Sequence, residues 1–475
     1  MWGKVFKVAV GAHAAYTFYQ NRQRHKENSA RFMDRGEERI LFSPKNRGLL
    51  LDGRERRLSH EDSFRNLAVV ATTGGGKSSS FIVPNILALD DASMVITDPS
   101  GALFARTAHD LKRRGFDVLK LDPLDLMGSL RYNPLARART FPEMNEIAHV
   151  LVHTAASGRD VDPIWPAGAQ DILAILIKCL KNHPQADRYA NLANLQYLLL
   201  AFGDGRPLIP FVTDNAPDQA TFQAFNGFLS QADRTMQGMV SQAKTAVSML
   251  SDSQIAKLTA SNSFSFEQLR TRKTAVFLVF PQNRISYYSV LANLFYTQLF
   301  HYCLDDRTYN ERSLPVYFLL DEFGHFKVPD FPAIITTTRA RRISISIVLQ
   351  SVSQLVERYG PEGANTILNG GMANRVFLSV PDIHSAKDIS AIIGEVYTNR
   401  VNQQGDVRTE HEPMVTPAAL MAMSQKQALL LVSGMRPLQF EVTRYYERRD
   451  FAKRAEAKPF QGQRQPVWDV ELVPL

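Results

Sequence analysis

The stretch ATTGGGKSSS at residues 71–80 decides the fold of this chain of 475 residues. It follows an apolar run at 67–71 that we read as a buried strand, and it precedes FIV at 81–83, which begins a predicted helix. Glycine adopts backbone angles that are closed to other residues, so several N–H groups of a glycine-rich turn can converge on one anion. A strand, a glycine-rich turn and a helix N-terminus in this order predict a phosphate-binding loop.

The residues within this loop have the chemistry that a bound nucleotide needs. Lys77 supplies a cation for the β- and γ-phosphates, and the Ser78 hydroxyl is a ligand for Mg²⁺. Ala71 stands where the usual motif has its first glycine, and its side chain is small enough for the turn. We therefore predict that the chain binds ATP and Mg²⁺. The expected nucleotide-binding residues are Thr72, Thr73, Gly74, Gly75, Gly76, Lys77, Ser78 and Ser79.

A second stretch, VYFLLDEF at 316–323, supplies the acids that nucleotide hydrolysis requires. It reads as a buried strand that ends in two carboxylates. We expect Asp321 to bind Mg²⁺ together with Ser78, directly or through water, and we expect Glu322 to polarise the attacking water. The apolar residues on both sides of the pair make a merely solvated strand end the weaker interpretation.

Two further polar features lie near the next predicted strand, ISISIVLQ at 343–350. Gln350 ends this strand and is predicted to sense the γ-phosphate from the neighbouring strand tip, with a plain polar cap as the alternative. An arginine cluster precedes the strand and consists of Arg339, Arg341 and Arg342. An arginine that reaches a neighbouring subunit's nucleotide can raise the hydrolysis rate ~10³–10⁵-fold. A surface cluster that binds nothing is the equally open alternative.

The distribution of apolar patterns indicates an α/β core that is interrupted by a helical region. Nine apolar runs read as strands and alternate with helical segments, which is typical of a mostly parallel sheet covered by helices on both faces. Between the third and fourth runs, amphipathic helical patterns replace strands, with predicted breaks at Pro163, Pro166, Pro184, Gly203 and Pro217. We predict a basic N-terminal segment (1–40), a nucleotide-binding domain in two parts (41–140 and 269–448), an inserted all-α domain (141–268) and a C-terminal tail (449–475).

The composition is that of a globular protein with basic ends. Apolar residues make up 45% and charged residues 21% of the chain, and these ordinary values exclude a disordered polypeptide. The formal net charge is +8, and Lys and Arg gather in 1–60 and 444–464. These ends can contact nucleic acid, contact an anionic membrane, or simply be solvated. Cys179 and Cys303 lie in apolar helical patterns and are predicted to be core residues in a reducing compartment.

The N-terminus carries a weakly apolar segment at 8–19. This segment falls short of the about 20 apolar residues that a membrane-spanning helix needs. Aromatic residues followed by Arg22, Arg24 and Lys26 are compatible with an anchor that lies in the membrane interface. We therefore expect a cytoplasmic protein without an adequate transmembrane helix. A position at the cytoplasmic face of the inner membrane is left open.

Several stretches, in the same order along the chain, resemble one family. The resemblance spans roughly 65–446 and is to type IV secretion coupling proteins of the TraG/TraD-like kind. It implies a RecA/FtsK-like P-loop motor that assembles into a ring, with a hexamer expected. The stretches that carry it are TTGGGKSSSFIVPNIL, TDPSG, GFDVLKLDP, RYNPL, LLDEFGHF, TTTRARRISISIVLQSVSQL, ANTILNGGMANRVFL and MVTPAALMAMSQKQALLLVSGMRPLQFEVTRYY.

The resemblance also implies partners and residue roles. Such proteins bind single- or double-stranded DNA with little sequence preference and deliver relaxase-bound DNA to the type IV secretion channel during conjugation. Their all-α domain recruits the relaxosome or another secretion substrate. The residues matched by motif are Lys77 and Ser78 (Walker A), Asp321 and Glu322 (Walker B), Gln350 (the glutamine at the end of the next core strand) and Arg339 (the arginine finger).

Two departures from the family pattern and two alternative functions stay open. The family usually carries an N-terminal transmembrane anchor, and this chain shows no adequate one. Ser100 stands where a lysine is common in the family's D-P-K-G turn. A related motor that moves protein effectors or chromosomal DNA would have the same ATP site. A docking platform that binds nucleotide with little turnover is the alternative from another class, and the intact Walker residues argue against it.

Overall fold

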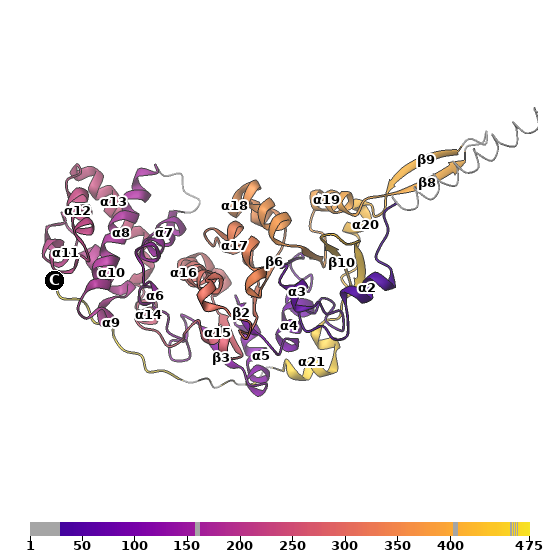
Figure 1. The fold of residues 1–475 in the computed structure, drawn as a ribbon, viewed down its shortest axis with the longest axis horizontal. Helices are drawn as coiled ribbons and strands as arrows, with labels where there is room; N and C mark the ends of the chain where they lie inside the picture. Colours follow the sequence, from indigo (N-terminus) through magenta and orange to yellow (C-terminus); the bar gives the residue numbers. More distant parts are fainter. Residues whose placement is uncertain are drawn as a thin grey trace, which may run out of the picture.

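The structure is a computed structural model that describes residues 29–156, 162–401, 407–456 and 464–475, together with residues 458, 460 and 462. Most of the predicted basic N-terminal segment, including the weakly apolar stretch at 8–19, lies outside the described residues. A helical half and a half built around a sheet lie side by side, and a long β-hairpin projects from the far end of the sheet half (Figure 1). Of the helices in the described ranges, none combines the length and the apolar character that crossing a membrane requires.

The core of the sheet half is a nine-stranded sheet with the strand order β11-β10-β7-β1-β6-β5-β2-β4-β3. The seven strands from β1 to β7 are all parallel, and β10 runs antiparallel to both of its neighbours. The prediction of a mostly parallel sheet is therefore confirmed. The bounds are β1 Leu67–Val70, β2 Ser93–Thr97, β3 Asp117–Leu121, β4 Thr274–Leu278, β5 Val316–Leu320, β6 Ile343–Leu349, β7 Asn374–Phe377, β10 Gln427–Val432 and β11 Leu438–Glu441.

The strands are apolar on both sides because helices cover both faces of the sheet. In β5, Phe318 points into one apolar layer and Tyr317 into the other, as the two-residue period of a strand requires. One layer contains side chains of α16, α17 and α18, and the other contains side chains of α4 and α5. These helices span Ile285–Leu304 (α16), Phe331–Thr337 (α17), Ser353–Asn365 (α18), Val83–Ala88 (α4) and Ala102–Arg113 (α5).

The helix after the glycine-rich loop begins with a turn of π-helix, η1, at Lys77–Ile82, and continues as α4. The N–H of Val83 donates to the carbonyl of Ser78, five residues earlier. Pro84 has no N–H with which to continue the usual ladder, and the wider π-turn precedes it. The helix predicted here is present, and it begins with this π-turn.

Between β3 and β4, the described residues form helices and no strand. The central helix of this region, α8 (Ile164–Asn182), is packed by its neighbours on several sides. The sequence analysis placed a break at Pro166, but this residue lies inside the first turn of α8, where no intrahelical N–H is needed. The other helices are α7 Phe141–Ala156, α9 Ala186–Tyr189, α10 Leu192–Leu200, α11 Ile209–Asn215, α12 Gln219–Leu229, α13 Asp233–Ala246 and α14 Ser253–Leu258.

Two features outside the core differ from the sequence expectations. The hairpin of β8 (Glu395–Val401) and β9 (Val407–Pro413) was not predicted. The end of the C-terminal segment is held rather than solvated, because the N–H of Val473 donates to Asn194 Oδ1 at 2.8 Å on the helical half (Figure 1). The remaining helices are α2 Arg35–Leu41, α3 His60–Ser63, α6 Pro134–Arg137, α15 Gln268–Thr271, α19 Ile383–Ile393, α20 Pro417–Met421 and α21 Arg449–Arg454.

Candidate active site

The glycine-rich loop leaves the carboxyl end of β1, in the middle of the sheet. Gly74 and Gly76 have φ angles of 77° and 86°, which lie in the left-handed region that side chains disfavour. The start of the loop is tied to the strand beside it. The N–H of Thr72 donates to Ser379 Oγ at 2.8 Å, and the two hydroxyls lie 3.0 Å apart. With the start of the loop held in this way, the glycine-rich turn that follows can wrap around a ligand.

The two motif stretches, 243 residues apart, meet at the carboxyl ends of β1 and β5. The hydroxyl of Ser78 donates to Asp321 Oδ2 at 3.0 Å. Asp321 is 6% exposed, and burial together with the charge of Glu322 raises the pKa of its carboxyl to about 6. A carboxylate in this position is costly unless a cation compensates it. The pair therefore has the composition of part of a metal site.

Glu322 follows Asp321 but lies in a different environment. Its φ of 53° is in the left-handed region, a strained backbone of the kind that concentrates at functional sites. Its carboxylate lies 3.5 Å from His325 Nε2 and 3.4 Å from Lys77 Nζ. These contacts, led by that with His325, and a hydrogen bond from Gln350 lower the pKa of Glu322 to about 2. Glu322 is therefore an ionised carboxylate that faces the loop.

Gln350 connects Glu322 to the glycine-rich loop. Its Nε2 donates to Glu322 Oε2 at 3.0 Å, and its Oε1 accepts from Thr73 Oγ1 at 3.4 Å. Its backbone N–H donates to Gln354 Oε1 at 2.9 Å, which orients the end of the strand. Gln350 thus lies where the γ-phosphate of a bound nucleotide is expected, and the structure brings it into the site.

Arg339 does not join this site within one subunit. It lies before β6, at the opposite end from Gln350, and seven strand residues at about 3.3 Å each separate the two by roughly 20 Å. Arg341 pairs with Asp306, and Arg342 donates to the carbonyl of Glu311. Within the described residues, the exposed side chain of Arg339 has no such partner.

Sequence reasoning missed three residues around the site. His325 contacts Glu322, and its place three residues after Glu322 in the sequence could have indicated this contact. Ser379, which anchors Thr72, gives no signal before strand order is known. Arg444 lies beside the loop, because a Cβ on Gly76 would stand 3.9 Å from Arg444 Nε.

The residues present fit Mg²⁺ better than a metal held by a protein cage. In the part of the chain that the structure describes, no three His, Cys, Asp or Glu side chains gather in a way that could hold a metal ion. Mg²⁺ is usually bound by one or two protein ligands, several waters and phosphate oxygens. Ser78 and Asp321, in contact at 3.0 Å, supply such a partial set.

Comparison with known proteins identifies the family. A family model described as "Type IV secretory system Conjugative DNA transfer" matches residues 25–467. The chain belongs to this family. Its relatives include protein VirD4 of Rhizobium rhizogenes, with 24% identity over 406 residues that cover 80% of this chain and 58% of that protein. Conjugal transfer protein TraG of Agrobacterium fabrum (strain C58 / ATCC 33970) is 24% identical over 413 residues, which cover 80% of this chain and 60% of that protein.

Solved structures of conjugative coupling proteins share the fold. The chain is similar to TrwBdeltaN70 in its unbound monoclinic form, with a TM-score of 0.69 and 18% identity over 94% of this chain and 96% of that chain. Plasmid coupling protein TrwB in complex with ADP and Mg²⁺ gives a TM-score of 0.67 and 17% identity over 94% and 97%. The core is therefore the RecA-like P-loop fold of these proteins. The chain spans less than two thirds of the length of the VirD4 and TraG relatives.

Proposed function

We propose that this protein is an ATP-hydrolysing coupling protein that recruits DNA with its relaxase and drives it to a type IV secretion channel. The observation that carries the proposal is the 3.0 Å contact between Ser78 and Asp321, which joins two distant motifs into one site. Membership of the conjugative DNA transfer family supports the cargo. TrwB, which shares the fold, has been solved with ADP and Mg²⁺, and this supports the ligand.

Each side chain of the site has its own proposed role in hydrolysis. Lys77 and the amides of the loop hold the β- and γ-phosphates, and Lys77 exchanges its contact with Glu322 for the nucleotide. Ser78 and Asp321 hold Mg²⁺, which neutralises charge on the phosphate oxygens. Glu322, kept ionised by His325 and its other contacts, accepts a hydrogen bond from the attacking water and orients it.

A second subunit completes the site in this proposal. Arg339 is exposed and unpaired among the described residues, at the end of β6 away from its own nucleotide site. In a ring, such an arginine can reach the γ-phosphate bound by the neighbouring subunit. We expect a hexamer in which each Arg339 serves the next site, so that hydrolysis in one subunit is sensed by another.

The helical half is the proposed receptor for cargo. We propose an inserted all-α domain at 141–268 between the two parts of the nucleotide-binding domain, 41–140 and 269–448. Its helices α11 and α12 lie at the end of the helical half that is farthest from the sheet (Figure 1), so this end can bind the relaxosome or another secretion substrate without blocking ATP. DNA without strong sequence preference, held through its phosphates by basic side chains, is the expected nucleic-acid partner.

The proposal is tested by an ATPase assay on the purified protein with single-stranded DNA, double-stranded DNA and no DNA. We expect DNA to stimulate hydrolysis and the stimulation to decline as salt rises, because phosphate contacts are screened. The same preparation is sized with and without ATP to detect ring assembly. Hydrolysis at one rate under all three conditions contradicts the DNA motor and favours a motor for protein effectors. No hydrolysis at all favours the docking platform.

A further inference from the structure

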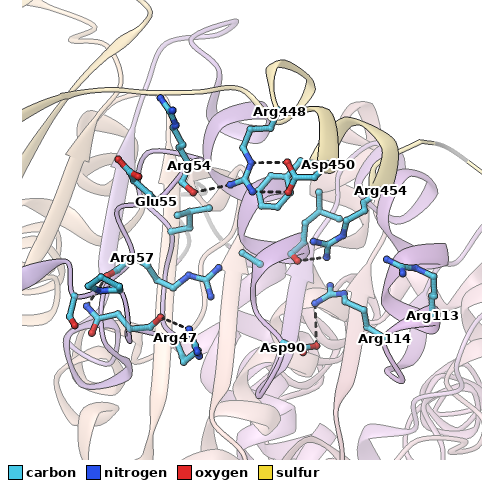
Figure 2. Close-up of a pocket in the computed structure, with 17 residues that line it drawn as sticks. Arg47, Arg54, Glu55, Arg57, Asp90, Arg113, Arg114, Arg448, Asp450 and Arg454 are labelled. Carbon is cyan, nitrogen blue, oxygen red and sulfur yellow. Dashed lines mark hydrogen bonds and ion pairs between the residues drawn. The ribbon is translucent and has the colours of Figure 1, made fainter.

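A second pocket lies away from the nucleotide site, on the side of the sheet covered by α4 and α5 (Figure 2). It has a volume of about 580 Å³ and is lined by residues of 43–57, 87–114 and 448–454. The helix that starts at Lys77 ends at Ala88, and at 1.5 Å per residue these ends lie about 16 Å apart. The pocket lies at the far end of this helix and is therefore distinct from the nucleotide site.

The pocket carries a surplus of positive charge. Seven of its 17 lining residues are arginines, against three acids. Four of these arginines have acidic partners within the protein. Arg448 pairs with Asp450 at 2.7 Å. The buried carboxylate of Asp110, which lies beneath the pocket, pairs with the other three, Arg113, Arg114 and Arg454. These four arginines are therefore held by ion pairs within the folded protein.

The other three arginines have no ion pair with any described residue. Figure 2 shows Arg57 extending into the middle of the pocket with Arg47 beside it, whereas Arg54 is directed outward. Burial, and then the like charge of Arg47, lower the pKa of the Arg57 guanidinium. The charge of Asp91 partly offsets this effect. A half-buried charge that has no ion pair raises the free energy of the folded protein, and a bound anion would offset this cost.

We propose that this pocket binds a small anion that carries two phosphate groups. A planar guanidinium pairs with a phosphate through two parallel N–H donors, so Arg47 and Arg57 match one phosphate each. A volume of about 580 Å³ is in the range of small-molecule sites. Duplex DNA, in contrast, is held by an extended basic stripe. The phosphates can belong to a soluble diphosphate or to the headgroup of a lipid.

Such a ligand would neutralise the two unpaired arginines of the segment 43–57. It would do so in a pocket that the end of α4 and the segment 448–454 also line. Because a ligand that binds only the folded state stabilises it, the unfolding temperature should rise with ligand concentration. This readout does not depend on ATP hydrolysis, so the inference stands or fails separately from the proposed function.

Pyrophosphate is the first probe, titrated by calorimetry into the full chain carrying Lys77→Ala, which weakens binding at the P-loop. The test variant adds Arg47→Gln and Arg57→Gln. The control variant instead adds Arg234→Gln and Arg312→Gln, two exposed arginines without ion pairs among the described residues and outside the pocket. Both double variants change the net charge equally. Melting curves without pyrophosphate check that all three proteins fold.

We expect the pocket variant to weaken pyrophosphate binding by roughly tenfold or more and to abolish the rise in unfolding temperature, because hydrogen bonds between charged groups are lost. The control should bind as its parent does. Equal weakening in both variants, or no binding by the parent, overturns the proposal. If the pocket variant instead loses DNA binding while keeping its affinity for pyrophosphate, the surface is a nucleic-acid contact and the proposal is wrong.

A second experiment identifies the source of the phosphates. The same proteins are sedimented with phosphatidylcholine vesicles that contain or lack cardiolipin, a lipid with two phosphate groups. Binding that requires cardiolipin together with Arg47 and Arg57 assigns the pocket to a lipid headgroup. Pyrophosphate binding that requires both arginines, without such vesicle binding, assigns it to a soluble diphosphate. Both results support the site, and failure of both to depend on these arginines rejects it.

Discussion

The nucleotide site and the arginine pocket lie at opposite ends of one helix and differ in how their charged side chains are paired. In the nucleotide site, Lys77 is 8% exposed and contacts Glu322 at 3.4 Å, so this cation is paired with an acid before a ligand arrives. In the pocket, Arg47 and Arg57 have no acidic partner among the described residues. A site that performs chemistry needs fixed and balanced groups, because each must act at one atom. A site that only binds can carry surplus charge.

This comparison predicts different consequences for substitutions in the two regions. Changes at the nucleotide site should alter hydrolysis while the fold persists. Changes around the pocket should alter stability and anion binding while hydrolysis continues. Arg339 tests this distinction between the two regions, because it lies away from its own nucleotide site and is expected to act on the nucleotide site of a neighbouring subunit.

The largest effect is expected for Lys77→Ala. Loss of the ammonium removes the cation for the β- and γ-phosphates and leaves Glu322 without its 3.4 Å contact. We expect hydrolysis to fall to background and nucleotide affinity to fall with it, measured by phosphate release and by binding of a fluorescent ATP analogue. Lys112→Ala, on the outer surface of α5, serves as the control and should behave as wild type. Near-normal turnover by Lys77→Ala would mean that the active site lies elsewhere.

Arg339→Ala should suppress hydrolysis by roughly 10³-fold or more while ATP affinity is retained, since the arginine contacts the transition state and not the bound nucleotide alone. Mixing Arg339→Ala with Glu322→Gln protein should restore activity at shared interfaces that keep both intact residues. Arg312→Ala controls for loss of an exposed charge. If mixing restores nothing although mixed rings form, the arginine does not act between subunits.

Glu322→Gln should reduce hydrolysis by roughly 10²-fold or more, because a neutral amide polarises the attacking water less than a carboxylate does. ATP should still bind, since the loop and Lys77 are unchanged and a negative charge near the phosphates is gone. Single-turnover measurements separate these two effects. Glu311→Gln, an exposed acid, is the matched control. A variant that hydrolyses ATP at the wild-type rate would remove Glu322 from the mechanism.

The smallest effect on hydrolysis is expected for Asp110→Asn, which should instead lower the free energy of unfolding by about 1–3 kcal/mol. Asp110 is 2% exposed and pairs with Arg113, Arg114 and Arg454, and its pKa is lowered by these contacts. A lowered folded pKa stabilises the protein above the unfolded value of about 3.9 and less as pH falls through that region.

The wild-type advantage in unfolding temperature over Asp110→Asn should therefore be full at neutral pH and shrink once the pH falls below the unfolded pKa of about 3.9. Asp233→Asn, on the exposed surface of α13, is the control and should show no such difference. A difference between wild type and Asp110→Asn that stays constant even at pH values well below the unfolded pKa would show that the carboxylate charge is not what stabilises this region.

Much of the fold could be predicted because the signals are local. All nine apolar runs are strands of the main sheet, and the seven parallel ones are easiest to predict because buried parallel strands are apolar on both sides. The hairpin β8–β9 was missed because its sequence, from Glu395 to Pro413, is rich in polar residues and it packs outside the core. Pro166 was misread as a break because a proline in the first turn and one between helices look alike in sequence.

The site was predicted in part for the same reason. Glycine, lysine, serine and paired acids at fixed spacing reveal their chemistry without a structure. The contacts that support them do not. Ser379 and His325 reach the site only because β7 lies beside β1 and because the backbone of Glu322 takes a φ of 53°. Arg47 and Arg57 likewise show their lack of partners only in the folded protein.

By itself, the order of amino acids determined where strands, helices and the phosphate-binding loop form, because backbone conformation and hydrophobic periodicity depend on neighbours along the chain. Only the tertiary structure decided which charges are paired and which carboxyls are ionised. Asp321 and Glu322 are adjacent, yet the pKa of one is raised to about 6 and that of the other is lowered to about 2. The reason is physical: burial and Coulomb interactions depend on distance in space, and residues 243 positions apart can lie in contact.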